Sequence, residues 1–502
     1  MSVAKRSTTR GLVSLLGLVG FQPTGGWTTL TQTRYGTSLG RIYNESLGIE
    51  EPGSPLHSLG LLWTLPLFVD DQTGLGGTIT WAWDEGLCDH LLPSVNERYW
   101  MMSTVNCDAL RASAHRAFDT WSMNHHHIKF TDVSARCVAE GMPATQCPHA
   151  EIALTAAEGL LAELGQLPAT TIPSETLAAD FRYTNGKSPI RTFGIYDSIR
   201  AVPAVVGATI NIRANNVCWY TDSQFCSPLH GWKRFWGSPA AAYFVGATLF
   251  IAMWGFAVVG AVSVLFTAIK RNARAQQGLL AASKKKKKDD EDEGYWVHTQ
   301  ATLDAIASMT LRDVALRIFL IIAPWPYFMA AFHTCWNCYD FEAAMAHEVG
   351  TLLGLGPPNL AASNYHVGFA NGSFVMGDST CRGDIWAGVQ AGVPPGAELD
   401  PLTSVRPSIM QDFTLHSPRN CLQLDDLEAL SILYPSCQGS PMTPVCAKTA
   451  LNLGWMRLLV FSVVPCIVAF VVAVAIQQCA YTNTLSELGL APKKTYQDAN
   501  FR

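Results

Sequence analysis

The residues in this chain best suited to do chemistry lie in the stretch His-Glu-Val-Gly-Thr-Leu-Leu-Gly-Leu, which begins at His347. In helices of the pattern H-E-x-x-H, two histidines one turn apart bind Zn²⁺, and the glutamate acts as general base on a metal-bound water. His347 and Glu348 fit the first two positions, but Thr351 occupies the position of the second histidine. Pro357 stands where a third histidine would complete the longer pattern H-E-x-x-H-x-x-G-x-x-H. The stretch therefore predicts a zinc-hydrolase helix in which His347 is the remaining ligand.

Catalytic zinc requires three protein ligands and an open position for water. A threonine hydroxyl is a weak donor to zinc and a proline side chain offers none, so we expect zinc to be bound weakly or not at all. His366 and His416 are the candidate substitute ligands. The run His125–His127 reads more simply as a turn before a strand. If a rearranged ligand set does hold zinc, Glu348 is the expected general base.

Composition indicates a membrane protein. The 502 residues are 48% hydrophobic and only 15% charged, and the mean hydropathy is positive at +0.14. The formal net charge of −5 gives no case for a nucleic-acid partner. Membrane lipid is the expected partner of the apolar segments.

Three apolar segments are predicted to cross a membrane, at 240–269, 316–333 and 458–476. The first is uncharged over more than the roughly 20 residues needed to span the hydrocarbon core. The second is weaker, because Pro324 and Pro326 interrupt it, and a buried helix of a soluble domain is the alternative. The chain is thus expected to be a multi-pass membrane protein.

Charge predicts the orientation of these spans. The segment 270–314 opens with lysine and arginine and contains the run Lys284–Lys288, and such positive loops stay on the cytoplasmic side. A solvated charge block is the expected state of this loop, because an acidic run follows the lysines. The flanking regions then face the extracellular or lumenal side, and the tail 477–502 is cytosolic.

The cysteines agree with this orientation. Two of the fourteen cysteines, Cys466 and Cys479, belong to the last span and its edge, and the other twelve fall in the regions placed outside. An even set on the oxidising side predicts disulfides. A metal site at Cys335-x-x-Cys338 is the alternative, but it lacks a convincing second pair. Asn44 and Asn371 begin glycosylation sequons on the same side.

The N-terminus reads as an export signal. Basic residues precede the apolar run Gly11–Phe21, so residues 1–26 are expected to be a signal peptide or anchor, although no clean cleavage site follows. A second apolar stretch, Leu59–Val69, is either the true signal core or a strand. Residues 27–76 are read as a lead-in.

Periodicity predicts the elements of the exported region. Strands are expected at 78–83, 128–133, 151–155 and 208–212. One face of a helix at Leu110–Asn124 carries apolar residues at helical spacing: Leu110, Ala114, Ala117, Phe118 and Trp121. Asp340 is a plausible N-cap for the helix that carries His347, and a last helix is expected at Leu424–Leu433.

The order of these segments resembles the catalytic domain of the matrixins, a family of metzincin zinc endopeptidases. Ser408-Ile-Met410 looks like the Met-turn, whose methionine forms a floor beneath the metal, and Leu422–Tyr434 resembles the closing helix. The segment 208–212, with the Trp219-Tyr-Thr that follows, looks like the edge strand along the substrate cleft. The resemblance implies an α+β fold with a twisted, mostly parallel sheet, formed by residues 77–235 and 335–450 and interrupted by a transmembrane hairpin. It also implies zinc as cofactor.

The sequence departs from the matrixin pattern as well. The Pro-Arg-Cys-Gly switch of the family's prodomain is not found, and the segment that holds structural zinc and calcium is not visible. We therefore expect a degenerate metalloendopeptidase-family ectodomain that binds extracellular polypeptide. An active peptidase with rearranged ligands is the second hypothesis. A membrane scaffold or transport protein is the third, disfavoured because no span carries a central ionisable residue.

Overall fold

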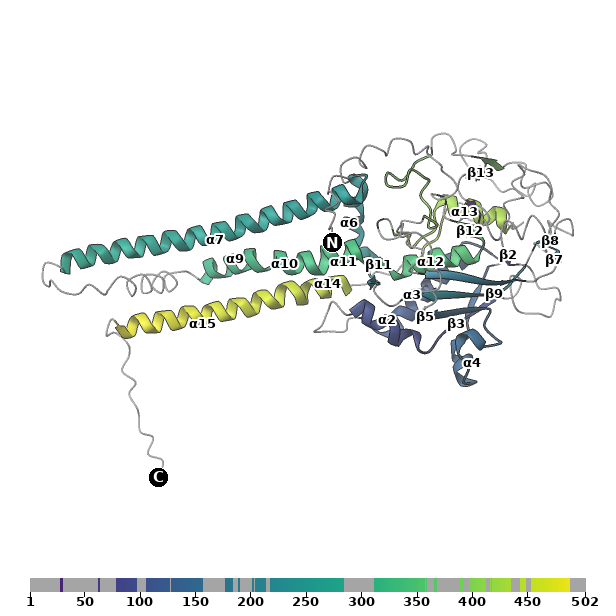
Figure 1. Cartoon of the computed structure of the whole chain (residues 1–502), viewed down its shortest axis with the longest axis horizontal. Coiled ribbons are helices and arrows are strands. Elements are labelled where there is room, and N and C mark those ends of the chain that lie inside the picture. The colour runs from purple at the N-terminus through teal and green to yellow at the C-terminus, as the bar shows by residue number, and fades with distance from the viewer. Residues whose placement is uncertain are drawn as a thin grey trace, which may run out of the picture. The chain divides into compact units, whose positions relative to one another are not determined.

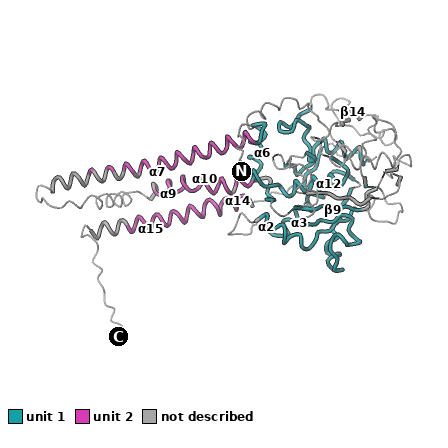
Figure 2. The backbone as a smooth tube through the Cα atoms, in the orientation of Figure 1, with its two compact units in different colours: residues 1–239, 335–451 teal, residues 240–334, 452–502 magenta. Residues whose placement is uncertain are grey.

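The computed structural model divides the chain into two compact units (Figure 2). Unit 1 comprises Met1–Pro239 and Cys335–Leu451, and unit 2 comprises Ala240–Thr334 and Asn452–Arg502. The structure describes residues 28–29, 62–63, 78–96, 105–126, 128–156, 177–183, 188–189, 201–202, 204–213, 217–283, 311–356, 358, 365–367, 389–391, 397–411, 416, 418–434, 443–447 and 453–487. The predicted signal segment, the lysine run, both sequons and the cytosolic tail beyond 487 lie outside these residues.

A mostly parallel sheet organises unit 1 (Figure 1). Its strands follow the order β2-β9-β5-β3-β4, all paired in parallel, and β6 pairs antiparallel with β9. The bounds are Leu62–Trp63 for β2, Ile79–Trp83 for β3, Phe130–Asp132 for β4, Ile152–Ala156 for β5, Leu177–Tyr183 for β6 and Ala204–Ile212 for β9. The expectation of a mixed helix-and-sheet protein with a mostly parallel sheet is confirmed.

One predicted strand is present, but its position in the sheet differs from the prediction. The segment 208–212 is not an edge strand, because Ala208 of β9 pairs with Ile152 of β5 and also with Phe181 of β6. The antiparallel strand β6 lies outside β9 instead. All five residues of β3 are buried, as expected for a parallel sheet covered on both faces.

Four helices of unit 1 matter for the site. Helix α3 (Cys107–Ser122) buries the apolar face predicted for it, with Trp81 of β3 stacked on Phe118 at a centroid distance of 4.7 Å. Helix α12 (Phe341–Leu352) has Asp340 as its N-cap, as predicted, and packs on α3. Helix α13 (Leu424–Leu433) has the predicted bounds. Helix α6 (Ser223–Phe235) precedes the first candidate membrane span. The short helices α2 (Leu87–Asn96) and α4 (Ser134–Ala139) complete the region around the sheet.

Short strand pairs complete unit 1. Strand β1 (Thr28–Thr29) pairs with β12 (Leu355–Gly356), and β7 (Ser188–Pro189) pairs with β8 (Ala201–Val202). Strand β13 (Tyr365–Val367) pairs with β14 (Val389–Ala391). Strand β10 (Trp219–Tyr220) pairs with β11 (Tyr339–Asp340), and this pair joins the two ends of the chain segment that leaves for unit 2.

Five disulfides link cysteines of unit 1: Cys88–Cys107, Cys137–Cys147, Cys218–Cys338, Cys226–Cys335 and Cys421–Cys446. The expectation of a disulfide-linked region is confirmed, while Cys381 and Cys437 lie outside the described residues. The alternative of a metal site at Cys335 and Cys338 is wrong, because both sulfurs are bonded to other cysteines. Among the described residues, Cys466 and Cys479 form no disulfide.

Among the described residues, three helical segments are long and apolar enough to cross a membrane, at Pro239–Val264, Val314–Asn337 and Gly454–Cys479, and nearly all of their residues belong to unit 2. The first belongs to α7 (Pro239–Ser283), which continues past the predicted start of the cytosolic loop, so residues 270–283 are helical. The second is built from α9 (Leu311–Ile322), α10 (Pro324–Tyr327), the π-helical turn η6 (Phe328–His333) and α11 (Thr334–Asn337). The third contains α14 (Leu453–Leu458), the π-helical turn η8 (Leu459–Val463) and α15 (Val464–Glu487).

Candidate functional site

Helix α12 carries the candidate site and is buried along its whole length. Its first turn is closed by the Asp340 side chain, which accepts hydrogen bonds from the backbone N–H groups of Glu342 and Ala343 at 3.1 and 3.2 Å. A carboxylate at this end also favours the helix dipole. From α3, the Trp121 indole donates to the carbonyl oxygen of Ala346 at 2.8 Å. These hydrogen bonds fix where α12 lies against α3 and how it is rotated about its own axis.

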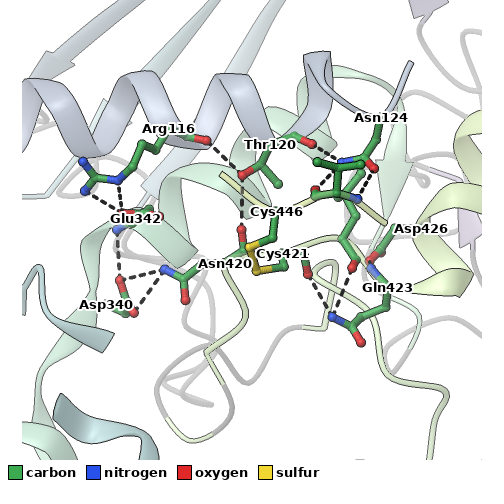
Figure 3. The surroundings of a disulfide bond; sticks show 12 residues. Arg116, Thr120, Asn124, Asp340, Glu342, Asn420, Cys421, Gln423, Asp426 and Cys446 are labelled. Atoms are coloured by element: carbon green, nitrogen blue, oxygen red, sulfur yellow. Dashed lines mark hydrogen bonds and ion pairs between the residues drawn. A yellow bond between two sulfur atoms is a disulfide. The ribbon is translucent and has the colours of Figure 1, made fainter. Parts of the chain in front are cut away.

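The N-terminal turn of α12 is bonded to α3 and to the segment before α13 (Figure 3). Arg116 of α3 forms an ion pair with Glu342 at 2.7 Å. The Asn420 side-chain amide lies 3.3 Å from an Asp340 carboxylate oxygen, and the Asn420 carbonyl accepts from the Thr120 hydroxyl at 3.2 Å. The neighbouring residue, Cys421, is in a disulfide with Cys446. These bonds join α3, α12 and the segment before α13 into one support.

His347 is buried, with 6% of its surface exposed, and its Nδ1 lies 3.1 Å from the carbonyl oxygen of Ile409. A carbonyl can only accept, so Nδ1 carries the proton in the neutral ring and Nε2 keeps its lone pair. Burial lowers the pKa of His347 to about 4, so the ring is neutral at pH 7. Metal-binding histidines in proteins are oriented by this kind of bond to a backbone carbonyl.

The Ile409 carbonyl is held in turn by α13. The Asp426 carboxylate accepts from the Ser408 hydroxyl at 2.5 Å and from the Ile409 N–H at 2.9 Å. It also accepts from the N–H of Gln423 at 2.7 Å, which closes a capping box at the start of α13. Burial raises the pKa of Asp426, and these hydrogen bonds oppose that shift. Asp426 thereby fixes the turn that orients His347.

Met410 lies directly against α12 at Gly350. A β-carbon built on Gly350 would stand 2.3 Å from the Met410 sulfur and 2.5 Å from a ring carbon of Trp121. Any side chain there would displace one of these groups, so glycine is required by close approach. The predicted Met-turn residue is thus brought beneath the helix one turn from His347.

The hydroxyl of Thr351 is engaged within the helix. Its Oγ1 donates to the carbonyl oxygen of His347 at 3.3 Å, and the residue is buried. This is the local back-bonding common to threonine in helices. Glu348 lies beside His347 on α12 and is also buried.

The other candidate ligands are not gathered at His347 by any described contact. His416 lies near Trp336, with ring centroids 6.0 Å apart, and burial followed by the charge of Lys233 lowers the His416 pKa to about 4. His125 contacts the Tyr434 carbonyl oxygen at 2.6 Å, consistent with a structural role. Pro357 and the side chain of His366 lie outside the described residues, although His366 belongs to strand β13.

The described donors near α12 do not make up the three ligands of a catalytic zinc. Within the described part of the chain, no group of three His, Cys, Asp or Glu side chains could hold a metal ion. His347 offers one nitrogen, and position 351 offers a hydroxyl already used by the helix backbone.

Two residues that hold α12 and its neighbouring turn in place were not predicted from the sequence. Gly350 and Asp426 both lie in segments that were singled out, but neither is a ligand type with a recognisable spacing. The signal for Asp426 was the pattern Gln423-x-x-Asp426 before an apolar run, which is a capping-box pattern. Nothing local in the sequence indicated that Gly350 would meet Met410.

Comparisons with known proteins give no independent assignment. No protein-family model, curated protein or solved structure matches the chain.

Proposed function

We propose that unit 1 is a membrane-anchored, matrixin-like metzincin ectodomain that has lost peptide hydrolysis and binds extracellular polypeptide. Three arrangements support the fold assignment: the mostly parallel sheet, the His-Glu helix packed on α3, and Met410 seated beneath Gly350. The disulfides of unit 1 support an extracellular or lumenal location, since such bonds persist in oxidising compartments.

One observation carries the loss of hydrolysis. The side chain at 351 is a hydroxyl that donates to the His347 carbonyl, where a second imidazole is needed. A neutral hydroxyl binds zinc far less well than imidazole, so Glu348 has no strongly polarised water to deprotonate. The His-Glu helix is therefore present, but the second zinc ligand on it is missing.

Strand β6 supports polypeptide binding. It pairs with β9 along one edge, and no described strand pairs with its other edge. An extended peptide can add to such an edge through main-chain hydrogen bonds, which need no metal. We expect the bound chain to run along β6.

A second candidate, an active peptidase with a rearranged ligand set, is favoured by the state of His347. Its Nδ1–H is fixed by the Ile409 carbonyl, which leaves Nε2 oriented as in metal-binding histidines. His366 and His416 are the residues that would have to complete the set. Zinc measurements therefore distinguish the two candidates.

The test is zinc stoichiometry of the full chain purified in detergent without chelator. We expect much less than one zinc per chain, and no cleavage of a fluorogenic casein substrate. The double variant Thr351→His, Pro357→His should gain stoichiometric zinc, because it restores the i, i+4 pair and the third ligand. Adding His347→Ala to this double variant is the control, and it should lose that gain. One zinc per unmodified chain, with cleavage abolished by Glu348→Gln, would establish the active peptidase instead.

Polypeptide binding has its own test. The full chain in lipid nanodiscs should bind denatured casein and release it intact. In a strand, adjacent residues direct their N–H groups to opposite sides, so one of Ala178→Pro and Ala179→Pro removes a donor from the outer edge of β6. That variant should weaken casein binding while keeping the unfolding midpoint. Equal binding by both folded variants would remove β6 from the proposal.

A further inference from the structure

Unit 2 contains a large apolar groove between its three candidate spans. Its volume is about 850 Å³, within the roughly 300–1,000 Å³ typical of small-molecule sites. The walls come from α7, from the segment α9–η6, and from α14 with η8. Helix packing is interrupted here by Pro324, which cannot donate to the preceding turn, and by the two π-helical turns.

One wall of the groove is a stack of aromatic rings. Phe250 of α7 stacks on Phe328 with centroids 4.6 Å apart and an interplanar angle of 26°. Phe328 stacks in turn on Phe332 at 5.2 Å and 17°. All three residues line the groove. The three rings form one continuous aromatic wall.

The groove also contains a polar group without a partner. The Ser462 hydroxyl of η8 is buried, lines the groove, and has no hydrogen-bond partner among the described residues. Serine in a helix usually donates to a carbonyl of the preceding turn, but Ser462 does not. A hydroxyl in hydrocarbon that lacks a partner is unfavourable, and a ligand hydroxyl would satisfy it.

We propose that this groove binds one membrane sterol, whose fused rings lie on the Phe250–Phe328–Phe332 wall and whose hydroxyl hydrogen-bonds to Ser462. The site is separate from α12 and does not depend on the function proposed for unit 1.

The lining discriminates between lipid classes. None of the groove residues carries a charge at pH 7, so no lining side chain forms an ion pair with a phosphate headgroup. An acyl chain has no group to bond with Ser462 and loses more rotational freedom when it is ordered, whereas a rigid ring system loses little. These features favour a sterol over a phospholipid chain.

The experiment uses the full chain in phosphatidylcholine liposomes with a photoactivatable cholesterol analogue. We expect labelling of the peptides that contain Phe250 or Ser462, and we expect excess unlabelled cholesterol to suppress it. Gly246→Leu should abolish this labelling because it fills the groove. Gly255→Leu is its control, since Gly255 also lies in α7 and a β-carbon there meets nothing within 4 Å.

A second pair of variants tests the hydroxyl. Ser462→Ala should weaken competition by cholesterol about three- to tenfold, the usual effect of one hydrogen bond. Ser263→Ala, at an exposed serine of α7, should leave it unchanged. Labelling that cholesterol does not compete, or that survives in Gly246→Leu, would overturn the proposal. Stronger labelling of the same peptides by a photoactivatable phosphatidylcholine, or their protection by cross-linking to a second copy of the chain, would overturn it as well.

Discussion

The residues that hold α12 in place are all present, whereas only one of the residues that would bind zinc is present. The support is complete: Trp121 and Met410 pack against Gly350, and Asp426 fixes the turn whose carbonyl orients His347. At the ligand positions only His347 has the chemistry of a zinc ligand, and Thr351 bonds to its own helix. The difference teaches that the support contributes to stability by itself, since it needs no bound ion to satisfy its polar groups.

The strongest way to break this comparison is at Gly350. We expect Gly350→Ala to lower the free energy of unfolding by about 4 kcal/mol or to prevent folding, because the new methyl group overlaps Met410 and Trp121. The measurement is the urea midpoint of tryptophan fluorescence for the full chain in nanodiscs.

The matched control is Gly231→Ala in α6, where a β-carbon meets nothing within 4 Å. There the change should stabilise by up to about 1 kcal/mol, because alanine is the better helix former. If both variants unfold at the same midpoint, Gly350 is not a packing constraint.

The next largest effect concerns pH. Burial lowers the pKa of His347 from 6.5 to about 4, so between these values the unfolded chain holds a proton on this ring and the folded chain does not. The free energy of unfolding should therefore fall as pH falls from 6.5 to 4. At 1.36 kcal/mol per pH unit the total is about 3 kcal/mol. Urea midpoints measured across this pH range, with a chelator present, give the slope.

His347→Gln should remove that part of the pH dependence and keep a side-chain donor for the Ile409 carbonyl. His416 is a second contributor with the same sign, because its pKa is also lowered to about 4. His416→Gln should therefore reduce the slope independently. A slope unchanged by His347→Gln would mean that this ring is not buried in the neutral form.

A substitution at Asp426, on α13, measures how much the hydrogen bonds of its carboxylate contribute to stability. Asp426→Asn replaces a carboxylate oxygen with an N–H₂ group that faces other donors, and we expect a loss of about 2 kcal/mol. Asp119→Asn, at an exposed position on α3, is the control and should change stability by less than about 0.5 kcal/mol. Similar losses in both variants would indicate a general charge effect.

The sequence was informative where a pattern is local. The buried face of α3, the Asp340 cap, the bounds of α13 and the apolar spans all follow from periodicity or capping within a single segment. These features depend on residues a few positions apart, which is why they could be predicted.

Long-range partners could not be predicted in this way. Strand β9 is apolar and covered by neighbours on both edges, but an isolated apolar run does not reveal how many strands pair with it. Strand β6 was missed because Leu-Ala-Ala-Asp-Phe-Arg-Tyr has no clear alternation. The contact of Gly350 with Met410 joins residues sixty positions apart, so only the folded chain shows it.

The smallest expected effect is at Thr351, where the difference between holding the helix and binding a metal is tested most directly. Thr351→Val keeps the shape of the side chain and removes the hydroxyl that donates to the His347 carbonyl. Because that carbonyl already belongs to the helix, we expect a change of less than about 0.5 kcal/mol in the free energy of unfolding. The urea midpoint should match that of the unmodified chain, in contrast to Gly350→Ala one residue away. A loss of 2 kcal/mol or more would show that Thr351 belongs to the support, and the separation between holding the helix and binding a metal would then fail at this position.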